Sequence, residues 1–316
     1  MARELYPSIK PFASDWLETG DGHKVYFEQV GNPEGTPVIF LHGGPGSRCK
    51  DHHRCFFNPE KFHIILMDQR GAGRSRPLGR LKHNTTKHLI LDMEMIREKL
   101  NIETWLLFGG SWGATLALLY AQQYKQKVLG LILRGTFLAR GIDADWFFKD
   151  GANRLFPEAW LRFTQHISTN ERKNVLKAYY HRLGIDDAEV QQKTTREWDA
   201  WGAAVVLGDD FNADGLDGDV SETAIAQARI ETHYAMNRYF IEENQILDNA
   251  IRLRDLPCTI IHGKKDFMCP IESSFSLAQA LPNARFITLA NSTHLAHGEE
   301  MIDALVSAVD SIVEND

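Results

Sequence analysis

The chain reads Gly109-Gly110-Ser111-Trp112-Gly113 between two apolar runs, residues 105–108 and 114–119. The first run has the length of a buried strand, and the second has the character of a buried helix. A serine on a tight strand-to-helix turn is strained with its hydroxyl exposed, and larger neighbouring side chains would clash there. A Gly/Ser turn alone arises by chance, but the flanking strand and helix favour Ser111 as a nucleophile.

Similar apolar runs recur along the chain and are followed by turn residues. The predicted strands cover residues 38–41, 63–67, 105–108, 128–133, 259–261 and 286–289. Helical patterns lie over residues 87–100 and 299–313, and the second carries one apolar stripe at i, i+3, i+4 spacing. Uniformly apolar strands alternating with helices predict an α/β fold, with a mostly parallel sheet covered by helices on both faces.

The alternation of strands and helices stops after residue 133 and resumes near residue 256. The intervening residues 135–249 are rich in aromatic and charged side chains and have a mainly helical pattern. They are predicted to form an inserted helical cap over the carboxyl edge of the sheet. Residues 1–134 and 250–316 then form the catalytic core. Within the cap, Gly and Asp crowd together over residues 208–219, which indicates a loop.

Length and composition limit the class of protein. The chain has 316 residues, 43% of them hydrophobic, which suits one large α/β domain with an insertion. The formal net charge is -7 and no long run of Lys or Arg is present, so nucleic acid is not an expected partner. The oligomeric state is left open by the sequence.

The sequence also bears on location. The uncharged residues 104–124 are long enough to cross a bilayer, but glycines divide the stretch, so no membrane span is expected. Residues 1–16 lack an apolar segment followed by a small-residue cleavage site, and we therefore expect a cytoplasmic protein. The four cysteines form no C-x-x-C pair and are interpreted as reduced thiols.

A serine hydroxyl needs a base and an orienting carboxylate, in the chain order Ser, Asp or Glu, His. Asp266 follows the predicted strand 259–261, and His294 follows the predicted strand 286–289. Each therefore lies at the carboxyl end of a strand, the edge of such sheets where ligands bind. His297 is a rival base, but His294 is nearer to the strand end and is preferred.

Acyl transfer also needs hydrogen-bond donors for the oxyanion, each worth about 3 kcal/mol in the transition state. The stretch His42-Gly43-Gly44-Pro45-Gly46 directly follows the first predicted strand and is the candidate loop. The backbone N–H of Trp112, at the start of the helix, is the second candidate donor. A Gly/Pro-rich turn alone is usually only a turn, but here it accompanies the serine turn.

No cofactor is expected. The stretch Arg70-Gly71-Ala72-Gly73-Arg74-Ser75 lacks the third glycine of a dinucleotide fingerprint, and the chain has no phosphate-binding G-x-x-x-x-G-K-[ST] loop. His52-His53 and the pair His294 and His297 are not accompanied by H-E-x-x-H or a comparable carboxylate spacing. A metal site is therefore not predicted.

Taken together, several motifs strongly resemble the proline iminopeptidase (prolyl aminopeptidase) family. They are His42-Gly43-Gly44-Pro45-Gly46, residues 68–75, residues 109–116, and the cap segments 134–137, 151–160 and 228–234. The resemblance covers nearly the whole chain. It implies an α/β-hydrolase core with a helical cap, a triad of Ser111, Asp266 and His294, and Gly44 and Trp112 as oxyanion donors.

The resemblance also implies a serine aminopeptidase that releases N-terminal proline from small peptides. Glu231 would hold the substrate ammonium, the Gly43 carbonyl would share it, and Phe137 would line the pocket for the pyrrolidine ring. One position departs from the family, which has a second amine-binding glutamate where this chain has Gly202. Asp199, one helical turn earlier, is a candidate substitute.

Two other hypotheses remain open. The same triad would serve an esterase or amidase whose substrate has no free N-terminal amine, and Gly202 motivates this alternative. A catalytically silent binding protein is the other alternative, and only the altered cap supports it. The residue before His294 is Thr293, where the family usually has glycine, which concerns local geometry rather than the identity of the triad.

Overall fold

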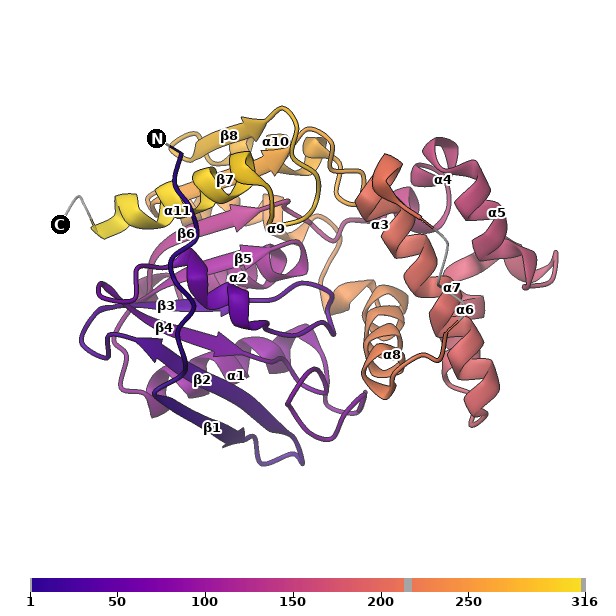
Figure 1. Cartoon of the computed structure of the whole chain (residues 1–316), viewed down its shortest axis with the longest axis horizontal. Coiled ribbons are helices and arrows are strands. Elements are labelled where there is room, and N and C mark those ends of the chain that lie inside the picture. Colours follow the sequence, from indigo (N-terminus) through magenta and orange to yellow (C-terminus); the bar gives the residue numbers. More distant parts are fainter. Residues whose placement is uncertain (1, 213–217, 314–316) are drawn as a thin grey trace.

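The computed structural model describes residues 2–212 and 218–313, and it contains one eight-stranded sheet (Figure 1). The strand order is β1-β2-β4-β3-β5-β6-β7-β8. The strands are β1 (Ala13–Glu18), β2 (Lys24–Gly31), β3 (Thr36–Leu41), β4 (Phe62–Met67), β5 (Trp105–Gly110), β6 (Val128–Arg134), β7 (Cys258–Gly263) and β8 (Arg285–Leu289). Neighbouring strands from β4 through β3, β5, β6 and β7 to β8 pair in parallel. β1 pairs antiparallel with β2, and β2 pairs antiparallel with β4.

Helices cover both faces of the sheet. One apolar cluster joins the sheet to α1 (Thr86–Lys99), α2 (Trp112–Gln123) and α10 (Ile271–Ala280). A second cluster, on the other face, joins it to α11 (Glu299–Val313) and the 3-10 helix η1 (Asp51–Phe56). Every residue of β4 and β5 is buried because both faces are covered. The predicted α/β fold class is confirmed.

The antiparallel hairpin of β1 and β2 is the part of the sheet that sequence analysis did not identify. β1 lies at the sheet edge, and its side chains are mostly exposed. Such a strand lacks the continuous apolar run that marks the central strands. The six predicted strands coincide with β3 to β8, with small differences at their ends.

The uncharged residues 104–124 divide as the glycines predict, into β5, a turn at Ser111 and α2. Among the helices of the described residues, none has both the length and the apolar character needed to cross a membrane. The four cysteines are all buried free thiols.

The described part of the segment between β6 and β7 contains helices and no strand. These are α3 (Gly141–Phe148), α4 (Ala152–Leu155), α5 (Pro157–Gln165), η3 (Glu171–Asn174), α6 (Val175–Leu183), α7 (Ala188–Leu207), η4 (Gly208–Asp210), α8 (Glu222–Met236), η5 (Arg238–Phe240), α9 (Gln245–Asp248) and η6 (Ala250–Leu253). Figure 1 shows most of them gathered beyond one end of the sheet. Of the predicted loop over residues 208–219, residues 213–217 lie outside the described residues.

The inserted helices have an apolar cluster of their own, in which Phe163 stacks on Tyr179 with ring centroids 4.3 Å apart. Helix α8 belongs to both parts of the molecule. Its Ala228 is buried in the cluster of the inserted helices, whereas Ile230 and Tyr234 are buried in the cluster of the sheet. α8 is therefore held from both sides, and side chains on it are fixed relative to the strand ends.

Candidate active site

Ser111 lies on the tight turn between β5 and α2 with φ 56° and ψ -125°, a strained conformation for a residue other than glycine. The two glycines around it are required by close backbone contacts. A Cβ atom on Gly113 would lie 2.0 Å from the Leu41 carbonyl oxygen, and one on Gly109 would lie 2.3 Å from the Gly113 carbonyl oxygen. The turn thus holds the serine at the carboxyl end of the central strand.

Asp266 and His294 come together behind this turn. His294 Nδ1 and Asp266 Oδ2 are 2.7 Å apart, while Asp266 Oδ1 accepts the backbone N–H groups of Met268 (3.0 Å) and Cys269 (2.8 Å). Burial acts to raise the pKa of Asp266, but its contacts with His294 outweigh this and leave the pKa lowered. A carboxylate in this state fixes the ring orientation of His294 and stabilises its protonated form.

The structure distinguishes the two candidate bases. His294 is 8% exposed and hydrogen-bonded to Asp266, whereas His297 is exposed at the surface of the same cavity. Ser111 and His294 both line this cavity. The Cys269 thiol lines the same cavity, and burial holds its pKa well above its ordinary value. Cys269 is therefore protonated and is not a competing nucleophile.

The loop 42–46 is fastened to the serine turn by a chain of hydrogen bonds. The Trp112 indole donates to Gln69 Oε1 (2.9 Å), and Gln69 donates from its backbone N–H to His42 Nε2 (3.0 Å). Because Nε2 accepts, the proton of His42 is on Nδ1, which donates to the Gly43 carbonyl (2.8 Å). Burial lowers the pKa of His42, so the ring remains neutral.

Both candidate oxyanion donors are close to Ser111. Trp112 is the first residue of α2, so its backbone N–H has no carbonyl partner within the helix. Gly44 is exposed to the cavity with φ +114°, a value that favours glycine. Its neighbour Gly43 approaches the serine so closely that a Cβ atom there would lie 3.5 Å from Ser111 Cβ.

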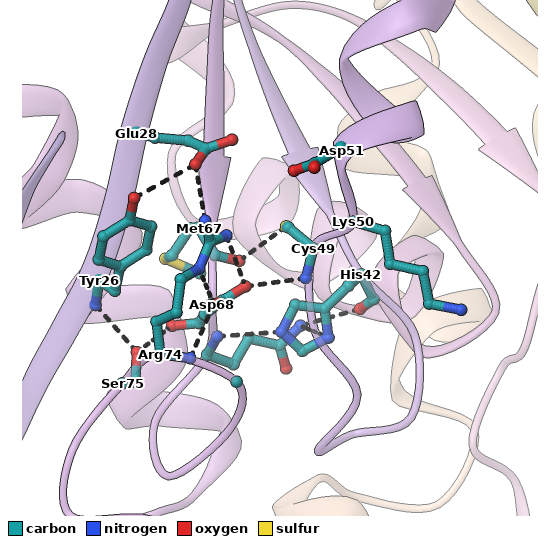
Figure 2. Close-up of polar contacts among 12 residues, drawn as sticks. Tyr26, Glu28, His42, Cys49, Lys50, Asp51, Met67, Asp68, Arg74 and Ser75 are labelled. Atoms are coloured by element: carbon teal, nitrogen blue, oxygen red, sulfur yellow. Dashed lines mark hydrogen bonds and ion pairs between the residues drawn. The ribbon is translucent and has the colours of Figure 1, made fainter. Parts of the chain in front are cut away.

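A buried ionic network lies beneath the loop (Figure 2). Asp68, at the end of β4, accepts the Cys49 backbone N–H (2.8 Å) and both the backbone N–H (2.9 Å) and Nε (2.8 Å) of Arg74. Arg74 also pairs with Glu28 (2.7 Å), which pairs with Arg54 (2.7 Å). The network ties the loops that follow β3 and β4 to each other and to β2.

A cavity of about 820 Å³ joins these residues to the inserted helices, and we call it the central cavity. Glu231 of α8 and Phe137 both line it. The Glu231 carboxylate accepts the Trp198 indole N–H (2.6 Å) and the Gln227 side-chain amide (2.9 Å). Burial raises the pKa of Glu231, although these two hydrogen bonds oppose the shift. Phe137 packs edge-on against Tyr239, with ring centroids 4.9 Å apart.

Asp199 and Gly202, both on α7, line the same cavity. A Cβ atom on Gly202 would meet no heavy atom within 4 Å, so the position faces open space. The Asp199 side chain is exposed to the cavity, and partial desolvation together with the Glu231 charge raises its pKa to about 7. The two carboxyl groups, Asp199 and Glu231, therefore interact across the cavity.

A possible metal-binding group lies elsewhere. Within the described residues, Asp21, His83 and His88 bring one ligand atom each to within 4.8 Å of one another. Asp21 is already paired with Arg70 at 2.5 Å, and the positive charge of Arg70 opposes a cation there. None of these residues lines the central cavity.

Sequence analysis missed several residues that support the site. Gln69 bridges Trp112 and His42, and Asp68 anchors two loops. The signal for both was their place directly after β4, at the same sheet edge as the serine turn. His262 is another, since its Nε2 lies 3.4 Å from Asp266 Oδ2 and 2.8 Å from the Cys269 carbonyl. No motif marks this supporting histidine.

Comparisons with known proteins agree with this geometry. A family model described as alpha/beta hydrolase fold matches residues 36–300. A proline iminopeptidase of Xylella fastidiosa is 42% identical over 315 residues, which are 98% of this chain and 100% of that protein. A probable proline iminopeptidase of Leptolyngbya boryana is 43% identical over 313 residues, 98% and 97% of the two chains. The chain belongs to the proline iminopeptidase family of α/β hydrolases.

The resemblance recognised in the sequence is thus confirmed for the family. Solved structures agree on the fold. A proline iminopeptidase-related protein of Thermus thermophilus is 22% identical with a TM-score of 0.59, over 97% of this chain and 98% of that one. A structure from work on carboxylesterases of Nitrososphaera gargenis has a TM-score of 0.61 at 17% identity, over 95% and 100% of the chains.

Proposed function

We propose that the protein is a serine aminopeptidase that releases N-terminal proline from small peptides through an acyl-enzyme. The observation that carries the proposal is the half-buried Glu231 carboxylate, which lines the same cavity as Ser111 and His294. We also propose that residues 135–249 act as a cap on a core of residues 1–134 and 250–316. The cap supplies the recognition of the amine, and the core supplies the acyl-transfer chemistry.

In the proposed mechanism, Ser111 Oγ attacks the carbonyl carbon of the substrate proline while His294 Nε2 takes the hydroxyl proton. Asp266 accepts the hydrogen bond from His294 Nδ1 and stabilises the imidazolium. The backbone N–H groups of Gly44 and Trp112 stabilise the oxyanion of the tetrahedral intermediate. His294 then protonates the leaving amine, the prolyl ester remains on Ser111, and a water molecule activated by His294 hydrolyses it.

Two carboxyl groups are proposed to bind the substrate ammonium. Glu231 already accepts two hydrogen bonds and has oxygen lone pairs free for a third partner. Asp199 shares the cavity with it, and a bound ammonium would oppose the desolvation and the Glu231 charge that together raise the pKa of Asp199 to about 7. The Gly43 carbonyl accepts one bond from His42 and retains a second lone pair for the same cation.

The ammonium site explains selection of an N-terminal residue. A blocked or internal peptide would leave the half-buried Glu231 carboxylate without a charged partner, at a cost of about 2 kcal/mol. Phe137, edge-on to Tyr239, offers an apolar wall to the pyrrolidine ring. The acyl part of the substrate therefore lies between α8 and the serine turn.

An esterase or amidase acting on a substrate without a free amine is the second candidate. The open space at Gly202 favours it, because that position carries no carboxylate to demand an ammonium. Glu231 favours the aminopeptidase over this candidate, since a half-buried carboxylate disfavours an apolar or neutral substrate group.

The test is a matched panel of arylamides and esters measured as kcat/KM. The panel contains Pro-, Ala- and Leu-arylamides, N-acetyl-Pro-arylamide and a short acyl ester, with Ser111→Ala as the blank. We expect kcat/KM for the free Pro-arylamide to exceed that for N-acetyl-Pro-arylamide by about 30-fold, which corresponds to the cost of leaving the half-buried Glu231 carboxylate without a charged partner. Preference for the blocked or acyl substrates would support the second candidate instead. Failure of a fluorophosphonate to label Ser111 would contradict both.

A further inference from the structure

The central cavity carries opposite charges from different parts of the chain. Glu231 and Asp199 come from the inserted helices, whereas Arg48 and Lys50 come from the loop after β3. Arg48 and Lys50 are both exposed, and neither has an ion-pair partner within the part of the chain that the structure describes. Of the three carboxyl groups that line the cavity, Asp143 is paired with Arg140. The two unpaired cations and the carboxyl groups of Asp199 and Glu231 therefore determine how charge is distributed along the cavity.

The backbone beneath the two cations is fixed. The Cβ of Arg48 packs so closely on the loop after β4 that a Cβ atom on Gly73 would lie 2.8 Å from it. The Lys50 backbone N–H donates to His53 Nδ1 (3.0 Å) at the start of η1. Cys49, between them, is held by Asp68. The positions from which the two side chains extend are therefore set by the core.

The nearest acidic neighbour in the chain does not neutralise Lys50. Asp51 pairs with Arg54 at 3.0 Å, and Figure 2 shows the Lys50 side chain extending away from the Asp51 carboxylate. Lys50 is instead one of the charges that, after burial, lower the pKa of His53 to about 3. Glu231, by contrast, is the charge that acts on Asp199. Arg48 and Lys50 extend from the loop after β3, whereas Asp199 and Glu231 extend from α7 and α8, so the opposite charges enter the cavity from different elements.

The proposed reaction determines which part of the substrate lies near each of these charges. If the ammonium of the substrate lies at Glu231 and its first carbonyl lies at Ser111, the leaving residue must occupy the remaining part of the cavity. A cavity of about 820 Å³ accommodates a ligand the size of a short peptide. A short peptide also has a second charged end, the C-terminal carboxylate. Arg134 also lines the cavity but donates to the His294 carbonyl, so the groups available to bind an anion there are Arg48 and Lys50.

We propose that Arg48 and Lys50 form a subsite for the C-terminal carboxylate of a dipeptide or tripeptide substrate. The inference rests on the proposed aminopeptidase function and adds the substrate class, unblocked short peptides with charges at both ends. The subsite acts on the leaving part of the substrate and leaves the reactive groups untouched. Binding of both termini discriminates short peptides from longer chains, whose carboxylates lie outside the cavity.

The test compares Pro-Ala with Pro-Ala-amide, which differ only in the C-terminal charge. Steady-state kcat/KM is measured for both substrates on the wild-type protein, on Arg48→Gln, on Lys50→Gln and on the double variant. We expect the wild-type protein to prefer Pro-Ala over the amide by about 2–10-fold, since each exposed ion pair contributes a factor of up to about 5. Each substitution should lower this preference mainly through KM, and the double variant should abolish it.

Two exposed cations outside the cavity provide matched controls. Arg252→Gln and Lys87→Gln make the same changes of charge at positions that do not line it, and both should retain the wild-type preference. Raising the salt concentration should weaken the preference because it screens exposed charges. Pro-Ala-Ala should also exceed its amide, whereas a peptide of eight residues should show no difference from its amide.

The outcomes separate the subsite from the proposed function. Cleavage of Pro-arylamide with equal kcat/KM for Pro-Ala and its amide, unchanged by the two substitutions, overturns the subsite and leaves the aminopeptidase standing. Loss of preference in the control variants also overturns it, because the effect would then come from net charge. If wild-type protein cleaves no Pro-arylamide, the proposed function fails and the subsite fails with it.

Discussion

The strand ends and the inserted helices supply the central cavity in different ways. Ser111, Asp266 and His294 each follow the end of a parallel strand, so the sheet itself brings them together. Glu231 and Trp198 lie on the successive helices α8 and α7, and they meet because these helices pack against each other. The reactive groups thus depend on backbone geometry, and the recognition groups depend on side-chain packing.

The largest effect is expected at the strand ends. Replacement of Ser111 by alanine removes the nucleophile, and kcat/KM for Pro-arylamide should fall by about 10⁴–10⁶-fold. The unfolding midpoint in urea should change little, because the substitution removes only the hydroxyl group and leaves the turn in place. A residual activity within 10-fold of wild type would show that the cavity reacts through another group.

Asp68→Asn tests whether the strand-end loops depend on the buried ionic network. Asp68 accepts hydrogen bonds from Cys49 and Arg74, so removing its charge should lower the free energy of unfolding by about 3–5 kcal/mol. The measurement is urea denaturation at pH 7, with the exposed Asp186→Asn as the matched control. A loss no larger than the control's would contradict a structural role for the network.

The same variant has an expected pH dependence. Burial acts to raise the pKa of Asp68, but its bonds to Arg74 outweigh this and leave the pKa lowered. A lowered pKa in the folded state stabilises the protein fully above the unfolded value of about 3.9, and this contribution is lost as pH falls through the folded value. The difference between wild type and Asp68→Asn should therefore shrink below about pH 4.

Glu231→Gln tests whether the inserted helices bind the substrate ammonium. Loss of the charge should lower kcat/KM for Pro-arylamide by about 30–150-fold, since a charge-assisted contact to the ammonium contributes about 2–3 kcal/mol. The Glu231→Gln variant should hydrolyse a short acyl ester, which has no ammonium, with nearly the wild-type kcat/KM. The control is Glu222→Gln, an exposed position at the start of the same helix. Equal losses on the two substrates would indicate damage to the strand-end chemistry instead.

The strand ends and the central strands are also the features that the sequence patterns predicted. The strands β3 to β8 were predicted because their apolar runs are short and continuous, and α11 because its apolar stripe spans the whole helix. Ser111 was found because the turn itself demands glycines at positions 109 and 113. Each of these features depends on residues close together in the chain, so a short stretch of sequence is enough to predict it.

Features that depend on contacts between distant segments left weaker signals. β1 was missed because an exposed edge strand has no continuous apolar run. Gln69 was missed because its function is to connect Trp112 with His42, which are 70 residues apart in the chain. Asp199 was a candidate from its spacing alone, and only packing of α7 beside α8 places it in the cavity with Glu231.

The smallest effect is expected at Asp199 of α7, which lines the central cavity together with Ser111 and Glu231. Its pKa is raised to about 7 by desolvation and by Glu231, so the group ionises between about pH 6 and pH 8. Over this range the ratio of kcat/KM for Pro-arylamide to that for an acyl ester should rise, because only the first substrate carries an ammonium. Using the ratio cancels pH effects on the catalytic groups, because these serve both substrates.

Asp199→Asn should remove this rise and lower kcat/KM for Pro-arylamide at pH 8 by about 3–10-fold, as expected for one partly exposed charge contact. Its stability should not fall at pH 8, because a carboxyl group whose pKa is raised in the folded state destabilises the fold once it ionises. Adding Gly202→Glu, into space that is open in the structure, should restore the preference for a free amine. If Asp199→Asn leaves the pH dependence of the ratio unchanged, Glu231 alone holds the ammonium and the inserted helices supply one carboxylate instead of two.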